Sequence, residues 1–195
     1  MTDTAAPVRA RRAPRMSPDD RRAAIVSAAL PLVMAQGSAV LTADIASAAG
    51  IAEGTIFRVF PDKEALLGAC LQAVADTTTV HGEMAAIEEE SLEDAVAGAI
   101  RILLTHLATA MPVVMRVTTT GPTPRSARGL RTQLTDETRQ ELSDVLARYA
   151  DQLGVPVEEA AHVLHVLVLG AAVQPDSLAA DPRLLARTFV SGVGA

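Results

Sequence analysis

Apolar side chains recur along most of this chain at intervals of three and four residues, the spacing of one face of an α-helix. No stretch alternates apolar and polar residues as a half-buried strand does. Two short helices are expected between residues 42 and 60. The other stripes predict helices over residues 17–37, 62–79, 91–110, 111–119, 126–153, 157–173 and 183–193. The pattern therefore predicts an all-α protein of about nine helices.

Polar residues at helix starts support several of these boundaries. Ser17 stands before Pro18, a residue that suits the first helical turn, and before two aspartates that complement the helix dipole. Ser91 with Asp94 three residues later resembles a capping box. Asp62 can cap the helix that follows it. The chain thus has clear helix starts near residues 17, 62 and 91.

The segment from residue 42 to residue 60 has the pattern of a helix-turn-helix. Ala46 is small enough for two helices to cross closely, Gly50 accepts the left-handed conformation of a tight turn, and Ile56 faces inward. The second helix is short enough to lie in the major groove of DNA. Its predicted outward face consists of Glu53, Gly54, Thr55, Phe57 and Arg58. The alternative is an ordinary corner between two helices that binds nothing.

The residues after this segment favour DNA. Pro61 ends the second helix, because a proline pushes the preceding residue out of helical geometry. Lys63 follows Asp62 in the first turn of a new helix, where a cation opposes the helix dipole unless an anion shares the site. A lysine beside the N–H groups of a helix start favours a phosphate contact. We predict phosphate contacts from Thr42, Thr55 and Lys63, and base contacts from Arg58, Glu53 and Gly54.

Five runs of residues carry a family resemblance: AAL at 28–30, QG at 36–37, LTADIA at 41–46, AAGIAEGTIF at 48–57 and FPDKEALL at 60–67. Together they make residues 25–67 resemble the N-terminal DNA-binding domain of the tetracycline-repressor (TetR-like) family of bacterial regulators. The resemblance implies a three-helix DNA-binding head on a helical body that dimerises. The family usually has a tyrosine where Phe57 stands, and its hydroxyl commonly reaches a phosphate. Phe57 cannot make that bond, which leaves it packing or a sugar contact.

The chain divides by charge as well as by motif. We expect a disordered basic arm over residues 1–16, the helix-turn-helix domain over 17–68, and a ligand-binding and dimerisation domain over 69–195. The net charge is −6, yet residues 1–68 carry eight basic against seven acidic residues, and the remainder nine against sixteen. The acidic excess is therefore expected to face away from DNA. The arginines of the arm either contact phosphates or the minor groove, or belong to a solvated tail.

Several features suit the cytoplasm. Cys70 is the only cysteine, so no disulfide can form within the chain. No signal peptide is expected, because the basic start is followed by acidic residues and not by an apolar run. The longest apolar run, residues 166–173, is too short to cross a bilayer. We expect a soluble cytoplasmic protein.

A ligand cavity in the body is implied by the resemblance, and four residues are candidates to line it. His106 is a polar group on an otherwise apolar stripe, where it can orient a ligand or be a hydrogen-bonded core histidine. The soft side chains of Met111 and Met115 fit either a core or a pocket. Tyr149 lies on the stripe of the helix predicted over residues 126–153. An apolar effector is expected.

The histidines of the predicted body allow a second interpretation, a metal site. His162 and His165 stand three residues apart, with Glu158 four residues before His162, and could form part of such a site. Hydrogen-bonded histidines at a helix interface are favoured instead, because one helix supplies too few ligands. No nucleophile-and-base spacing or phosphate-binding loop stands out. We therefore expect no metal, no other cofactor and no enzymatic activity.

The predicted helix over residues 157–173 is apolar nearly all round, so it must be covered on two sides. We assign it to a homodimer interface together with the last helix, and name Leu164, Val168 and Ala171 as contacts. The expected function is sequence-specific DNA binding by a transcriptional repressor that a small apolar ligand releases from a palindromic operator. The alternative is a helical metal-binding or catalytic protein with a vestigial helix-turn-helix.

Overall fold

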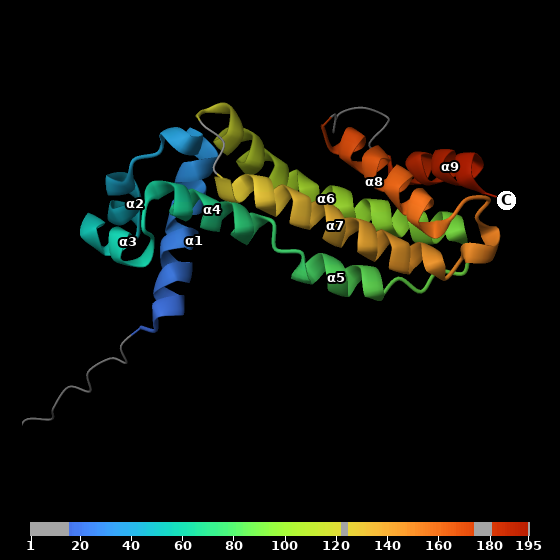
Figure 1. The fold of residues 1–195 in the computed structure, drawn as a ribbon, viewed down its shortest axis with the longest axis horizontal. Coiled ribbons are helices and arrows are strands. Elements are labelled where there is room, and N and C mark those ends of the chain that lie inside the picture. Colours follow the sequence, from blue (N-terminus) through green and yellow to red (C-terminus); the bar gives the residue numbers. More distant parts are fainter. Residues whose placement is uncertain (1–15, 122–124, 174–180, 195) are drawn as a thin grey trace, which may run out of the picture.

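The computed structural model describes residues 16–121, 125–173 and 181–194, and nearly all of this part of the chain is helical. Figure 1 shows a helical head, in which α1, α2, α3 and α4 are labelled, at one end of an elongated helical body. The elements, in order, are α1 (Pro18–Gln36), the short 3-10 helix η1 (Gly37–Ala39), α2 (Thr42–Ala48), α3 (Glu53–Val59), α4 (Lys63–Val74), α5 (Thr78–Ala85), α6 (Leu92–Thr119), α7 (Arg125–Ala147), η2 (Ala150–Gln152), α8 (Val157–Val173) and α9 (Pro182–Val193). The predicted all-α class is confirmed.

The predicted caps begin their helices as expected. The backbone N–H of Asp20 donates to the Ser17 hydroxyl at 3.0 Å, and that of Ala65 donates to the Asp62 carboxylate at 2.7 Å. Asp94 donates its N–H to Ser91 at 3.1 Å. The bounds predicted for α8 are also those observed.

Three predicted boundaries are wrong, and one of them is the end of the helix predicted over 126–153, since α7 ends at Ala147. The helices predicted over 91–110 and 111–119 are one helix, α6, with Pro112 in its interior. The ring of Pro112 removes one hydrogen bond, but apolar side chains on both sides of it are buried and hold the helix together. The helix predicted to reach residue 79 instead ends at Val74. Asp76 then accepts the N–H and hydroxyl of Thr78, at 3.0 and 2.6 Å, and a new helix, α5, begins.

Buried side chains form two clusters, and α6 belongs to both. The head cluster joins side chains of α1 to α4, including Ile25, Ile45, Ile56 and Phe60, to Val113 and Val117 of α6. The body cluster joins the earlier part of α6 to α5, α7, α8 and α9. The division predicted at residue 68 falls within α4, where Leu66 and Leu67 before it and Cys70 and Leu71 after it all belong to the head cluster. It stays a prediction, and the arm predicted over 1–16 lies outside the described residues except for Met16.

Cys70 lies in the head cluster, fully buried. Burial raises the pKa of its thiol to about 12, so the thiol stays protonated at neutral pH. The burial and the raised pKa fit an unreactive core cysteine, as expected from its place on an apolar helical stripe.

Two helical segments are long and apolar enough to cross a membrane by length and composition alone, Pro18–Ala39 and Leu92–Thr119. Both contribute side chains to the cores. Ile25, Ala29 and Val33 of α1 pack into the head cluster, and α6 packs into both clusters. A core helix of a globular protein passes the same test of apolar length, so these segments carry little weight as membrane spans.

Candidate DNA-binding surface and ligand cavity

The helix-turn-helix is formed by α2, a tight turn and α3. Gly50 has a φ of 65°, the left-handed conformation for which the sequence requires a glycine. The N–H of Ile51 closes the turn by donating to the carbonyl oxygen of Ala46 at 3.0 Å. Ile45 and Ile56, one from each helix, are completely buried between them. The turn and the inner face are therefore as predicted.

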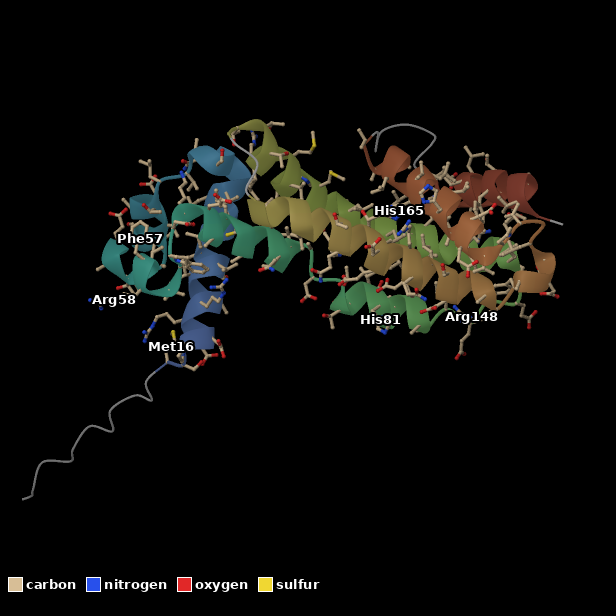
Figure 2. The ribbon with its side chains drawn as sticks, viewed as in Figure 1. Met16, Phe57, Arg58, His81, Arg148 and His165 are labelled. Atoms are coloured by element: carbon tan, nitrogen blue, oxygen red, sulfur yellow. The ribbon has the colours of Figure 1, made fainter. Side chains whose placement is uncertain are left out.

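The outer face of α3 carries the residues predicted to read DNA. Glu53, Gly54, Phe57 and Arg58 are exposed, and Thr55 is half-buried. Figure 2 shows Phe57 and Arg58 on the head, at the end of the molecule remote from α8 and α9. Phe57 is 48% exposed, so half of its ring is available for contact with a partner. Their contacts with DNA stay predictions.

Thr42 and Glu53 are paired with each other. The Thr42 hydroxyl donates to a carboxylate oxygen of Glu53 at 2.5 Å, which ties the start of α2 to the start of α3. In this arrangement the hydroxyl hydrogen is not available to a phosphate. The pair also places a negative charge at the N-terminus of α3, where it complements the helix dipole.

Lys63 is the first residue of α4, directly after the capping residue Asp62. It is half-buried, while the capping contact of Asp62 leaves the first turn in place. Nearby, the guanidinium of Arg22 lies 4.4 Å from the centre of the Phe60 ring. This cation–π contact joins α1 to the C-terminal end of α3.

The body encloses a cavity of about 690 Å³ walled by α4 to α8 and the α4–α5 connection. His106 and Met111 of α6 are among its lining residues, as predicted. Met115 is not, because it points outward and is 51% exposed. Tyr149 is not either, because it lies beyond α7, where its buried hydroxyl donates to the carbonyl oxygen of Glu89 at 2.5 Å.

His165 lines the cavity and was missed as a ligand-contacting residue. Its place on α8, on the same stripe as Ala161 and Val168, was the available signal. The side chain is buried, and no protein group among the described residues bonds its Nε2 atom. Burial lowers the pKa of His165, and the charges of Arg139 and His162 lower it further. His165 is therefore neutral at pH 7. Figure 2 shows it between α8 and the neighbouring body helices.

The predicted dimer contacts lie inside their own chain. Leu164, Val168 and Ala171 are all buried in the body cluster. The face of α8 that remains available to another molecule is the opposite one, which carries Val163, Val166 and Val173. A dimer stays a prediction, and these exposed residues replace the three buried ones as its candidates.

The structure thus has a helix-turn-helix at one end of a helical body that holds an apolar cavity. Residues 25–70 match the family model of bacterial regulatory proteins of the tetR family. The resemblance seen in the sequence is therefore confirmed over this domain.

Solved structures extend the likeness of fold to the whole chain. NalD of Pseudomonas aeruginosa, the secondary repressor of the MexAB-OprM multidrug efflux pump, is 18% identical with a TM-score of 0.65 over 91% of this chain and 98% of its own. A putative tetR-family regulator from Mesorhizobium loti has 16% identity and a TM-score of 0.73 over 91% and 98%. Reduced NemR of Escherichia coli has 19% identity and a TM-score of 0.68 over 90% and 98%. A search of curated protein sequences gives no significant match.

Proposed function

We propose that this protein is a cytoplasmic, homodimeric transcriptional repressor that binds a palindromic operator and leaves it when a small apolar ligand enters the body cavity. One observation carries the proposal: α6 lines the cavity and completes the core of the DNA-binding head. Met111, Val114 and Thr118 line the cavity. Val113 and Val117, on another side of the same turns, are completely buried in the head cluster.

This geometry supports a mechanical link between ligand and DNA. A ligand that displaces Met111 or Val114 also displaces this part of α6. Val113 and Val117 of the same turns then move with it, and they belong to the head cluster. Pro112 lies at the junction and has no N–H to donate to the carbonyl of Ala108, so α6 lacks one hydrogen bond there. Bending at this point would reorient the head with little disturbance of the body cluster.

The required energy is modest. A ligand shifts the equilibrium between DNA-binding and released states only by the difference in its affinity for the two. A tenfold loss of operator affinity needs about 1.4 kcal/mol of coupling, within the usual range for allosteric proteins.

A second copy of the chain fits the exposed face of α8. Val163, Val166 and Val173 are 49–67% exposed and follow one another at helical spacing. Gly170 lies on the same stripe, and a Cβ atom built there would meet no atom within 4 Å, so a partner helix can approach closely. One helix-turn-helix makes few contacts with DNA, and a dimer doubles them by reading two half-sites.

The proposal is tested first with DNA. Duplexes that the protein retains from a random pool should converge on a site with two-fold symmetry. Affinity for that site, measured by fluorescence anisotropy, should fall at least tenfold with some of the apolar compounds that raise the melting temperature of the protein. If no symmetric site is enriched, or if every stabilising compound leaves the affinity unchanged, the proposal is wrong.

The dimer is tested separately. Val166→Glu should give a monomer in size-exclusion chromatography and weaken operator binding, because it places a charge in the apolar stripe. The control is Met115→Glu, since Met115 on α6 has similar exposure but lies outside the stripe. A Val166→Glu protein that remains dimeric would move the interface elsewhere.

The comparisons do not favour the alternative of a metal-binding protein, because the matched domain and the structural neighbours are regulators. The two histidines of α8 also differ in environment. His162 is exposed whereas His165 is buried, so they do not face one common site.

A further inference from the structure

Among the described residues that line the body cavity, only the two histidines can carry a charge, and they do so only when protonated. Among the described lining residues there is no Asp, Glu, Lys or Arg. Most of the wall is aliphatic, and its polar members are Thr77, His106, Thr118, Thr135, Thr138 and His165. A charged molecule entering this space would lose its hydration without gaining an ion pair from the wall.

Several of the polar members already have partners within the protein. The Thr77 hydroxyl donates to the carboxylate of Glu137 at 3.2 Å, and the Thr118 hydroxyl donates to the carbonyl oxygen of Val114 at 2.9 Å. Thr135 also has a partner. His165 differs from these, because its Nε2 atom is buried with no hydrogen-bond partner among the described residues.

A buried polar atom without a partner costs free energy, commonly about 1–3 kcal/mol. His165 is only 7% exposed, so water outside the protein does not satisfy it. A bound molecule with a hydrogen-bonding group at this place would recover that cost. His165 lines the cavity, but its Nε2 atom has less than 1 Å² of accessible surface, so the imidazole must turn slightly to present this nitrogen to a ligand. The unpaired nitrogen of a lining residue then indicates both where a ligand binds and what polar group it carries.

We propose that the cavity binds an uncharged, largely apolar molecule that carries a hydroxyl group, and that His165 recognises the hydroxyl by a hydrogen bond. This inference rests on the proposed function for its regulatory meaning. A neutral imidazole has one nitrogen that donates and one that accepts, and a hydroxyl can do either, so it pairs with either tautomer of His165. The volume of about 690 Å³ suits a drug-sized molecule.

An anion is a poorer fit than a hydroxyl. Arg139 and His162 are the groups whose charges act on His165. The Arg139 guanidinium contacts the carboxylate of Asp136 at 2.7 Å on the same helix, although its Nε atom is buried without a partner among the described residues. The Asp136 carboxylate offsets part of the positive charge that a carboxylate ligand would need.

The test uses four probes that share a butylbenzene core and differ in the group at the para position: para-butylphenol, butylbenzene, para-butylbenzoate and para-butylbenzylamine. Dissociation constants are measured by isothermal titration calorimetry at neutral pH with the full chain. The phenol should bind about tenfold more tightly than butylbenzene, the value of one net hydrogen bond of about 1.4 kcal/mol. The charged probes should bind more weakly than butylbenzene.

Variants assign the preference to His165. His165→Leu should bind phenol and butylbenzene about equally and keep the affinity for butylbenzene, which shows that the cavity is intact. His165→Gln should retain part of the preference for the phenol, because an amide still donates and accepts. The matched control is His162→Leu, one turn earlier on the exposed side of α8, which should leave all four affinities unchanged.

The inference is overturned if no probe binds, if a charged probe binds best, or if His165→Leu keeps the tenfold preference. Operator affinity measured with each probe is a separate readout. A phenol that binds through His165 but leaves the operator affinity unchanged supports the ligand class and contradicts the switch. A switch operated only by compounds without a hydroxyl supports the proposed function and contradicts the ligand class.

Discussion

The backbone N–H of Ser38 donates a hydrogen bond of 2.8 Å to the side-chain oxygen of Thr120, joining residues 82 positions apart. Thr120 is the residue at the C-terminal end of α6, and its own hydroxyl donates to the carbonyl oxygen of Arg116 at 2.7 Å. Ser38 lies in η1, between α1 and the helix-turn-helix. The last turn of the cavity-lining helix is therefore fastened to the DNA-binding head by a specific contact.

Replacing Thr120 with valine should loosen this attachment. The change keeps the shape of the side chain but removes the acceptor, so the free energy of unfolding in urea should fall by about 1 kcal/mol. Hydrogen exchange at the Ser38 amide should become faster. Thr119→Val is the control, because the Thr119 hydroxyl donates only to Met115 of its own helix. Equal losses in both variants would show that the contact with the head contributes nothing.

At Gly37, α6 and the head approach closely. A Cβ atom there would lie 2.2 Å from the Thr120 side-chain oxygen and 2.5 Å from the carbonyl oxygen of Arg116. Gly37→Ala should therefore destabilise more than Gly50→Ala, although both glycines have positive φ. Gly50→Ala adds only backbone strain of roughly 1–2 kcal/mol, since nothing lies within 4 Å of its Cβ position. Thermal unfolding compares them, and a Gly37→Ala loss no larger than that of Gly50→Ala would show that α6 moves aside freely.

The sequence predicted those parts of the fold that depend on local chemistry. Ser17, Asp62 and Ser91 begin helices because a single side chain next to the backbone suffices to cap them. The positive φ of Gly50 follows from the same kind of local requirement. The family resemblance then supplied the overall arrangement of head and body.

What depended on distant partners was harder to predict. The helix α8 is apolar nearly all round, so its sequence does not say which face meets its own chain, and the dimer contacts were assigned to the buried side. Two helices were predicted over 91–110 and 111–119 because nothing local shows that two cores hold α6 on either side of Pro112. Tyr149 was placed on the cavity from its helical stripe alone, since no local pattern shows its bond to Glu89, 60 positions away.

The DNA contacts predicted for Lys63 and Arg58 differ in kind, and so should their variants. Lys63→Ala should weaken binding to all sequences and reduce the salt dependence by about one unit, because one phosphate contact is lost. Arg58→Ala should cost roughly 1–3 kcal/mol on the selected operator and relax its specificity, if the guanidinium reads a base. Titrations at several salt concentrations separate the two effects. Unchanged binding by both folded variants would contradict this assignment of the surface.

Glu53 should oppose DNA binding through its charge. Glu53→Gln keeps an acceptor for the Thr42 hydroxyl but removes a negative charge from the outer face of the helix-turn-helix. Affinity should rise roughly fivefold, which corresponds to the interaction of about 1 kcal/mol between two unit charges 4 Å apart in water. The measurement uses random-sequence DNA at fixed salt. A loss of affinity confined to the operator would show instead that Glu53 reads a base.

The pH dependence of stability should include a contribution from Glu141 on α7. Burial raises the pKa of this carboxyl above its ordinary value of 4.5, and the His81 side chain 3.5 Å away opposes the shift. Because the folded protein holds this proton more tightly, the stabilising effect is complete below the ordinary pKa and is lost as pH rises through the folded value. Glu141→Gln should therefore gain stability relative to the parent as the pH rises above the ordinary pKa of 4.5. Urea unfolding at several pH values tests this, and a difference that does not change with pH would contradict it.

Because α6 supplies side chains to both cores, the two parts of the molecule are not separate folding units. A fragment that stopped after α4 would lack Val113 and Val117, which are buried in the head cluster. Loss of the body cluster would likewise free the helix on which the head is built. Unfolding is thus expected to be one cooperative transition. The DNA-binding surface and the ligand cavity come from different parts of the sequence, but the head and the body should melt at the same temperature.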